Sequence, residues 1–547
     1  MTHKRQDLAT PGFSVKTQNV IALFVILAFA GVNVLSVLRN FAITTDEDKH
    51  YLYGEHIVSG DSSRFNPSTM PVTGLNALPK KIASFLGEGQ LKYWLSKYSV
   101  ARMVTIFFSC LTAYLVFHWA RSLYGFVPAL CSLILYVLDP NIIAHSQLVT
   151  TDIYTTSTLV FAFYTLWKFA HERNTRNGLL CLFALGLSQL AKYTAIVLFP
   201  LFLGTLLVYD LSLRNKSVQA REGINHLIFR YVKYAVFAIT ASILIINLGF
   251  LFNHTFTVFG EYKFRSGLFQ KLQTNLPALR SLPVPAPYPY LDGLDYMSDV
   301  EKRGAGAGNI YLLGQVRTGL GFPGYYVIAS ILKVPIPTQI IMLLALFFYF
   351  TRKGFSADFL KNEMFLAVTV IFYVIYFNFF FKTQVGIRYY LPVFPFLYIF
   401  SGSLFAGWEW FSITKKISSL ALLVYLFISV LSYHPYYLSY FNEIVWNRMH
   451  AYKYLADSNV DWGQDRNELD EYLLKNPDAI YKTRKVRTGT IVVRINDLVG
   501  VTTDPSQYAW LRDNFEPSDM IGHSYLVYKI TTEDINPLCA TIISCNE

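Results

Sequence analysis

Acidic residues gather directly after the first long apolar segment of the chain. Asp46, Glu47 and Asp48 are consecutive, and His50 follows two residues later. Adjacent carboxylates repel each other, so one of them can have its pKa raised toward the range of a general base. The alternative is a solvated turn that ends the preceding helix, and from composition alone this is the commoner situation. The cluster is a candidate catalytic site with Asp46 and Glu47 as its central carboxylates.

Two further polar residues, His145 and Asp152, stand in an otherwise apolar part of the chain. They flank the outer end of a predicted membrane-spanning helix over 152–170, on the same side as the acidic cluster. Asp152 would begin this helix, where the helix dipole favours a carboxylate. A plain capping role and a role in positioning a substrate both remain open from the sequence.

Three basic residues lie at the same predicted membrane face. Arg102 begins a predicted span, Arg388 precedes another, and Lys192 lies within the apolar stretch 178–209. A charge at membrane depth is costly unless it is paired or hydrated, so each one is a candidate functional group. Arg binds a phosphate through two hydrogen bonds and Lys binds it as a point charge, so the three could hold a lipid phosphate. For Arg102 the alternative is a side chain that extends to the lipid headgroups.

The sequence carries none of the common cofactor motifs. Asp, Glu and His can bind divalent cations, but the two-His spacing of zinc enzymes does not occur. Neither a Walker-type phosphate loop nor a dinucleotide glycine fingerprint is found. The sequence therefore disfavours an ATP-driven pump or a Rossmann enzyme. We expect no cofactor, and a divalent cation is possible but not expected.

The composition indicates a membrane protein. Of 547 residues, 53% are hydrophobic and 15% charged, whereas soluble globular chains carry about 25% charged residues. This excludes disorder, collagen and small disulfide scaffolds. The net charge of +11 would suggest a nucleic-acid partner in a soluble chain. Here Lys and Arg collect in the predicted inner segments, so we interpret the charge as a topology signal and expect no nucleic acid.

Eleven apolar segments approach the length of about 20 residues that crosses a bilayer. Their ranges are 20–40, 98–119, 125–138, 152–170, 178–191, 193–209, 234–252, 323–350, 364–381, 390–409 and 417–433. Some are short or adjacent, so the number could differ by one or two. The Lys and Arg bias of the short loops predicts a cytoplasmic N-terminus, and the first segment is too long for a cleaved signal peptide. An odd number of spans places the chain after residue 433 on the exported side.

Three polar segments are too long for simple connections. They are 41–97, 253–322 and 434–547, and the predicted topology puts all of them on the exported side. We expect a polytopic, mainly α-helical membrane domain over 1–433. We expect a small soluble α/β domain over 434–547.

Local patterns support the second domain. Residues 466–475 predict a helix, and the alternation in 487–494 and 524–531 predicts two strands. Cys539 and Cys545 could form a disulfide on the exported side, but their spacing alone leaves this open.

The motifs of these segments resemble a known group of enzymes. Thr45-Asp46-Glu47-x-x-His50, followed by Arg64-Phe65-Asn66-Pro67, is similar to the first outer loop of polytopic glycosyltransferases of the GT-C fold. The nearer likeness is to bacterial relatives of dolichyl-phosphate-mannose protein mannosyltransferases and of aminoarabinose transferases. Further matching motifs follow in order: His145-Ser-Gln-Leu-Val-Thr-Thr-Asp152, Leu187-Ser-Gln-Leu-Ala-Lys192, Gly386-Ile-Arg388-Tyr-Tyr-Leu-Pro392 and Asp457-Ser-Asn-Val-Asp-Trp-Gly-Gln-Asp465. The number and order of these short motifs carry the resemblance.

The resemblance implies an inverting transfer of a hexose or pentose from a polyprenyl-phosphate donor to a hydroxyl of a protein, lipid or glycan. Asp46 would be the general base that deprotonates the acceptor, with Glu47 positioning it. The leaving group is a lipid phosphate, which needs charge stabilisation more than protonation. The cations expected to bind this donor phosphate are Arg102, Lys192 and Arg388. The residues expected to position substrates are His50, His145, Asp152 and Glu443.

Two features leave alternatives open. Where relatives commonly show a Glu-His-Pro-Pro run, this chain has Ser68-Thr69-Met70-Pro71, which puts an identical acceptor in doubt. The motif Asp457–Asp465 is explained equally well as a part of the active cleft and as a capping network of the fold.

Two other functions compete with a transferase. A secondary transporter or flippase for a lipid-linked sugar would use the intramembrane charges as a substrate path. The three large polar segments and the lack of repeating halves argue against it. A non-catalytic membrane assembly protein is the third interpretation, and the paired acidic residues argue against that one. We expect an integral protein of the bacterial inner membrane whose partners are the bilayer, a lipid-linked sugar and an acceptor.

Overall fold

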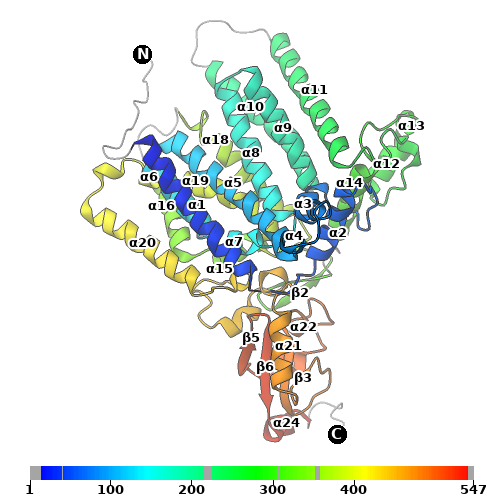
Figure 1. The fold of residues 1–547 in the computed structure, drawn as a ribbon, viewed down its shortest axis with the longest axis vertical. Coiled ribbons are helices and arrows are strands. Elements are labelled where there is room, and N and C mark those ends of the chain that lie inside the picture. Colours follow the sequence, from blue (N-terminus) through cyan, green and yellow to red (C-terminus); the bar gives the residue numbers. More distant parts are fainter. Residues whose placement is uncertain (1–13, 40, 215–223, 305–307, 352–357, 540–547) are drawn as a thin grey trace.

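A bundle of helices with a small α/β domain at one end makes up the computed structural model (Figure 1). The structure describes residues 14–39, 41–214, 224–304, 308–351 and 358–539. Apolar runs form helices here because a helix satisfies its own backbone polar groups. The bundle contains α1 (Val15–Val37), α5 (Tyr98–Tyr124), α6 (Phe126–Val137), α7 (Pro140–Ser146), α8 (Asp152–His171), α9 (Thr175–Ala191), α10 (Leu198–Arg214), α11 (Ile224–Gly249), α15 (Tyr325–Lys333), α16 (Ile336–Thr351), α18 (Met364–Ile375), α19 (Phe394–Ser401) and α20 (Ile413–Leu431).

Each predicted span contains helical structure, but fewer helices qualify as full membrane crossings. In the described part of the chain, five helices are long and apolar enough to cross a membrane, and bent pairs raise the number to at most seven. α9 has 17 residues and α18 has 12, which is short for an independent crossing. By length and composition the number is thus five to seven rather than about eleven. The prediction of an integral, polytopic helical protein is confirmed.

The predicted span 323–350 is broken in two. α15 and α16 meet at 117°, and α6 and α7 meet at 61°. Pro335 and Pro337 lie at the first break, where the missing N–H of proline prevents a continuous helix. At the second break, Asp139 precedes Pro140 and its carboxylate accepts a hydrogen bond of 2.7 Å from the Asn141 N–H, which starts α7 anew.

The long polar segments gather at the end of the bundle that carries the α/β domain (Figure 1). Hydrogen bonds join them: Asn253 Nδ2 donates to the Ser62 carbonyl at 2.8 Å, and Asn309 Nδ2 donates to the Gly500 carbonyl at 2.7 Å. Their elements are α2 (Glu47–Val58), α3 (Gly74–Ala83), α4 (Gln90–Leu95), α12 (Gly267–Asn275), α13 (Pro277–Arg280), α14 (Tyr288–Arg303), β1 (Asn309–Leu312) and β2 (Gln315–Thr318). The hydrogen bonds connect the segments into one layer, in which α12 and α13 lie beside α11 rather than across the end of the helices (Figure 1).

The C-terminal domain has a four-stranded sheet in the order β3-β4-β6-β5. β4 pairs antiparallel with β6, and Val492 lies opposite Val527. The predicted helix 466–475 and both predicted strands are confirmed by α21, β4 and β6. Residues 540–547 lie outside the described residues, so whether Cys539 and Cys545 form a disulfide stays open. The elements are α21 (Arg466–Lys475), β3 (Ile480–Tyr481), β4 (Gly489–Arg494), α22 (Ile495–Leu498), α23 (Ala509–Arg512), β5 (Asp519–Ile521), β6 (Tyr525–Ile530) and α24 (Thr532–Cys539).

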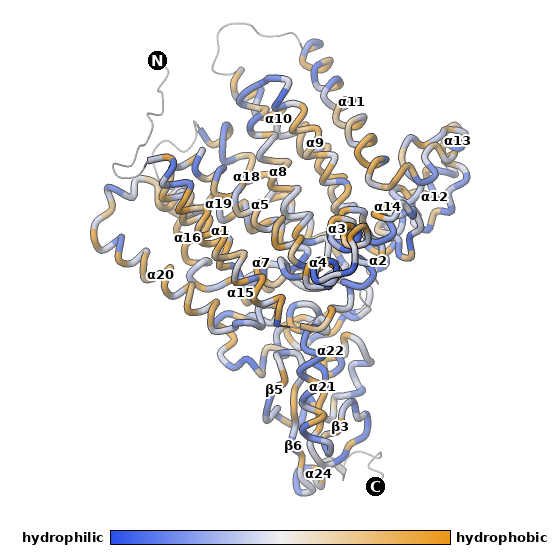
Figure 2. The backbone as a smooth tube through the Cα atoms, viewed as in Figure 1, coloured by the Kyte–Doolittle hydropathy of each residue, from blue (hydrophilic) through white to orange (hydrophobic). Residues whose placement is uncertain are grey.

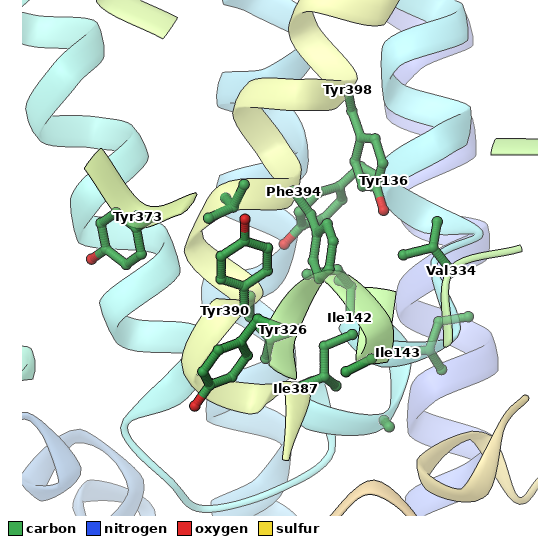
Figure 3. Packing of buried hydrophobic residues seen from close by; sticks show 14 of the residues in the cluster. Tyr136, Ile142, Ile143, Tyr326, Val334, Tyr373, Ile387, Tyr390, Phe394 and Tyr398 are labelled. Carbon is green, nitrogen blue, oxygen red and sulfur yellow. The ribbon is translucent and has the colours of Figure 1, made fainter. Parts of the chain in front are cut away.

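Aromatic packing supports the segment that leads into α19. A 3-10 helix, Ile387–Val393, precedes α19 and contains Arg388. Figure 3 shows Ile387 and Tyr390 of this helix within a cluster of buried aromatic and aliphatic side chains. The Tyr326 and Tyr390 rings stack with their centroids 5.4 Å apart. Close packing of this kind restrains the backbone on both sides of Arg388.

The outer face of the bundle is apolar (Figure 2). α11 exposes Phe229, Val236 and Phe237, and α20 exposes Ile417 and Leu420. Exposed apolar surface on this scale is unusual for a soluble protein and is typical of a surface that faces lipid.

Candidate active site

A cavity of about 490 Å³ lies between the bundle and the layer of polar segments. Asp46, Asp152, Lys192 and Arg388 line it, so four predicted site residues from distant parts of the sequence meet here. His50 lines it as well. The rest of the wall is largely apolar: Ile196, Val197, Leu268, Phe269, Leu294, Met297, Phe372, Tyr373, Tyr376, Phe377 and Phe381. The cavity therefore joins a charged region to an apolar one.

Asp46 precedes α2 and carries two cations on its carboxylate. Arg388 Nη1 lies 2.7 Å from Oδ2, and Lys49 Nζ lies 2.7 Å from Oδ1. Burial alone would raise the pKa of Asp46, but Arg388 and Lys49 outweigh it and hold the pKa below its usual range. The predicted rise in pKa from neighbouring carboxylates is wrong for Asp46, because the groups nearest to it are cations. Asp46 is ionised near neutral pH.

A second ion pair borders the first. Lys192 follows α9, and its Nζ lies 2.9 Å from Oδ1 of Asp152 at the start of α8. The same ammonium group sits 3.9 Å from the centroid of the Tyr389 ring. Arg388 Nη1 is 4.0 Å from Asp152 Oδ2, which connects the two pairs. Lys49, Lys192 and Arg388 thus face the cavity within one network of carboxylates.

Glu47 and Arg102 lie on the other side of α2 and form their own pair. Arg102 donates to both Glu47 oxygens, from Nε at 2.9 Å and from Nη2 at 2.6 Å. The N–H groups of Thr44 and Val149 donate to the same carboxylate at 2.9 Å each. Both side chains are at most 5% exposed. This geometry corrects the predicted role of Arg102 in phosphate binding, because its guanidinium is occupied by Glu47 and lies outside the cavity wall.

The remaining predicted residues take different places. His50 lines the cavity, and burial lowers its pKa to about 4, so the ring is neutral near pH 7. His145 is buried with its ring centroid 5.8 Å from that of Trp462. Glu443, which follows α20, is not among the described residues that line the cavity. Its Oε1 accepts a hydrogen bond of 2.6 Å from Ser429 Oγ within α20. The structure thus does not place Glu443 beside the other candidate site residues.

Several cavity residues escaped the sequence analysis. Lys49 is three residues after Asp46, a spacing at which side chains on a helix meet, so this contact could have been predicted. Tyr389 lay in a quoted motif without a role. Ser68 and Met70, which replace part of the run common in relatives, also line the cavity.

Asp457 is a third carboxylate near Arg388. It adopts a left-handed conformation with φ of 57°, which is uncommon for a residue with a side chain. Burial raises its pKa to about 6, although Arg388 opposes the rise. No group of three His, Cys, Asp or Glu side chains suited to a metal ion is present in the described ranges. Independence from metal stays a prediction.

We expect the Glu47–Arg102 pair to be structural. Removing one partner of a buried ion pair leaves an uncompensated charge, so Arg102→Met should lower the free energy of unfolding by about 3–5 kcal/mol. Thermal unfolding of purified protein in detergent measures this. The matched control is Arg121→Met on the same helix, whose guanidinium donates to Asn19 at a more exposed position. Equal effects of the two substitutions would contradict the structural role.

The chain is similar to known proteins in part of its sequence and in structure. The family model of dolichyl-phosphate-mannose-protein mannosyltransferases matches residues 96–229. No curated protein matches the chain. Among solved structures, ArnT from Cupriavidus metallidurans bound to undecaprenyl phosphate is 11% identical, with 95% of this chain and 99% of that chain covered and a TM-score of 0.49.

Two further solved structures are similar at the same level. Apo ArnT from the same organism is 14% identical, with 74% of this chain and 62% of that chain covered and a TM-score of 0.45. The apo oligosaccharyltransferase from Archaeoglobus fulgidus is 11% identical, with 75% and 54% covered and a TM-score of 0.45. In both cases the match spans less than two thirds of the solved chain. The family match over residues 96–229 confirms the resemblance to polytopic glycosyltransferases that the motifs suggested.

Proposed function

We propose that this protein is an inverting glycosyltransferase that moves a sugar from a polyprenyl-phosphate donor to a hydroxyl acceptor at the exported face of the membrane. The observation that carries the proposal is the cavity in which Asp46, Arg388 and Lys192 border a long apolar wall. An anionic headgroup attached to a prenyl chain has this distribution of charge and apolar surface. The family match and the motifs support the same substrate class.

In the proposed reaction Asp46 is the general base. The acceptor oxygen attacks the anomeric carbon, the bond from that carbon to the phosphate oxygen breaks, and the acceptor proton passes to a carboxylate oxygen of Asp46. One such displacement inverts the configuration and needs one base opposite the leaving group. The bonding electrons leave with the lipid phosphate, which departs as an anion and needs no general acid.

Arg388 and Lys192 are the proposed ligands of the donor phosphate. Both are held by carboxylates, Asp46 and Asp152, at distances of 2.7 and 2.9 Å. A phosphate that engages Arg388 competes with Asp46 for the guanidinium. The pKa of Asp46 then rises, because a cation that lowered it has turned to the donor. The donor would in this way strengthen the base that its own reaction requires.

The apolar wall is the proposed site of the prenyl chain. α12 and α14 contribute Leu268, Phe269 and Leu294 to one side, and α18 contributes Phe372 and Tyr373 to the other. Burying these surfaces against a hydrocarbon chain is favourable at about 25 cal/mol per Å² of apolar area. The lipid therefore supplies affinity while the headgroup supplies orientation.

Replacing the base should abolish transfer. We expect Asp46→Asn to lower the turnover by about 10²- to 10⁴-fold, the usual contribution of a general base. A panel of polyprenyl-phosphate hexoses and pentoses, incubated with host membranes and analysed by mass spectrometry, gives the rate at equal protein abundance. Asp48→Asn is the matched control, since Asp48 is exposed on the same helical turn. Wild-type turnover in Asp46→Asn would refute the assignment.

The cations should determine affinity for the lipid phosphate. We expect Arg388→Gln and Lys192→Gln each to weaken binding of undecaprenyl phosphate about tenfold or more, because a hydrogen bond to a charged group is lost. Binding is measured in detergent at two salt concentrations. Lys97→Gln is the control, as Lys97 is an exposed cation of the same polar segments. Unchanged affinity in both cavity variants would contradict the phosphate site.

Donor affinity should also depend on pH through Asp457. Below its pKa of about 6 the side chain is neutral, and above it a negative charge appears near Arg388, in a region that also contains Asp46 and Asp461. Binding of an anionic donor should therefore weaken as the pH rises through about 6. The probe is a polyprenyl methyl phosphate, since a phosphodiester does not titrate near neutral pH.

Asp457→Asn should remove this step in the affinity profile. Asp478→Asn is the control, because Asp478 is exposed in the same domain. A profile that keeps its step in Asp457→Asn would show that another group is responsible.

A further inference from the structure

One segment of the C-terminal domain, residues 457–464, lies against both members of the Asp46–Arg388 pair. It approaches the Arg388 backbone closely. Asn459 Oδ1 accepts a hydrogen bond of 2.9 Å from the Ile387 N–H, and Ser458 Oγ donates to the Val385 carbonyl. Between these two contacts stands Gly386, where any side chain would collide with Ser458. The backbone that leads into Arg388 is thus fixed by the C-terminal domain.

Trp462 contacts Arg388 with its ring and Thr45, the residue before Asp46, with its carbonyl. Its ring centroid is 4.2 Å from the Arg388 guanidinium carbon, and the side chain is buried. Its carbonyl accepts hydrogen bonds from Thr45, from the N–H at 3.0 Å and from Oγ1 at 3.2 Å. Thr45 directly precedes Asp46. The ring therefore contacts the cation, and the backbone holds the residue next to the carboxylate.

The segment itself is anchored on both sides. Asp461 binds the Arg494 guanidinium of β4 through two hydrogen bonds of 2.6 and 2.9 Å. Asn459 Nδ2 donates to the Tyr325 hydroxyl of α15 at 2.9 Å, and the buried Lys333 donates to the Asn459 carbonyl. One end of the network is in the sheet and the other is in the bundle. Trp462 is held at a fixed place between them.

We propose that Trp462 is a positioning residue for Arg388, through which the C-terminal domain completes the donor site. The inference rests on the proposed function, in which Arg388 must exchange Asp46 for a lipid phosphate. During that exchange the guanidinium loses its carboxylate, and the face of the indole keeps it in place. A planar guanidinium stacks well on an aromatic face and remains free to donate hydrogen bonds from its edge.

Binding of undecaprenyl phosphate to the full-length protein in detergent tests this inference. We expect Trp462→Leu to weaken binding about tenfold, the order of a desolvated cation–π contact, and Trp462→Phe to retain most of the affinity. Turnover at saturating donor should change less than the KM for the donor. Trp510→Leu is the matched control, because Trp510 is buried in the same domain and packs on Phe515.

A double-mutant cycle separates positioning from a general loss of structure. In an Arg388→Gln background, Trp462→Leu should have little further effect on binding, because the cation that it holds is gone. Equal losses in both backgrounds, or unchanged binding in Trp462→Leu and Trp462→Phe, would overturn the inference while leaving the proposed function intact. If the wild-type protein does not bind undecaprenyl phosphate, the proposed function fails and the inference fails with it.

Discussion

The ion pair between Asp46 and Arg388 is the contact on which the site depends. The two residues are 342 positions apart in the chain. Asp46 directly precedes α2, and Arg388 belongs to the 3-10 helix before α19. Each is largely withdrawn from water, so neither charge could be buried alone without a large desolvation cost. Pairing them joins the first polar segment to the packed core and fixes the mouth of the cavity.

The same constraint explains why the candidate charges occur in pairs. Asp46 is matched with Arg388, Asp152 with Lys192 and Glu47 with Arg102. Successive residues of a helix point about 100° apart, so residues 46 and 47 face different surroundings. One carboxylate meets the cavity and the other meets the core. Adjacent acidic residues thus have separate surroundings: Asp46 lies in the cavity as the proposed base, and Glu47 lies in a buried ion pair.

The sequence predicted the helices and strands better than it predicted which charged side chains pair with each other. Helix α21 and strands β4 and β6 follow from local periodicity, and Asp152 in the first turn of α8 follows from the helix dipole. Which cation meets which carboxylate depends on contacts between distant segments, which no local pattern records. Because its pairing with Glu47 is such a contact, the sequence analysis grouped Arg102 with Lys192 and Arg388 as a phosphate ligand. Glu443 was misplaced because nearness to the last span says nothing about the direction of its side chain.

The carboxylates that neutralise Arg388 and Lys192 also limit how the site can work. Asp46 and Asp152 already occupy the positions around Arg388 and Lys192 that an anionic donor would need. In the proposed function, a donor phosphate that displaces a carboxylate from Arg388 or Lys192 leaves that carboxylate more basic. Coupling between donor binding and base strength then follows from electrostatics without a large conformational change. This coupling requires that Arg388 stay in place while it exchanges Asp46 for the donor phosphate. The C-terminal domain contacts Arg388 and the backbone before it, and these contacts would hold it there.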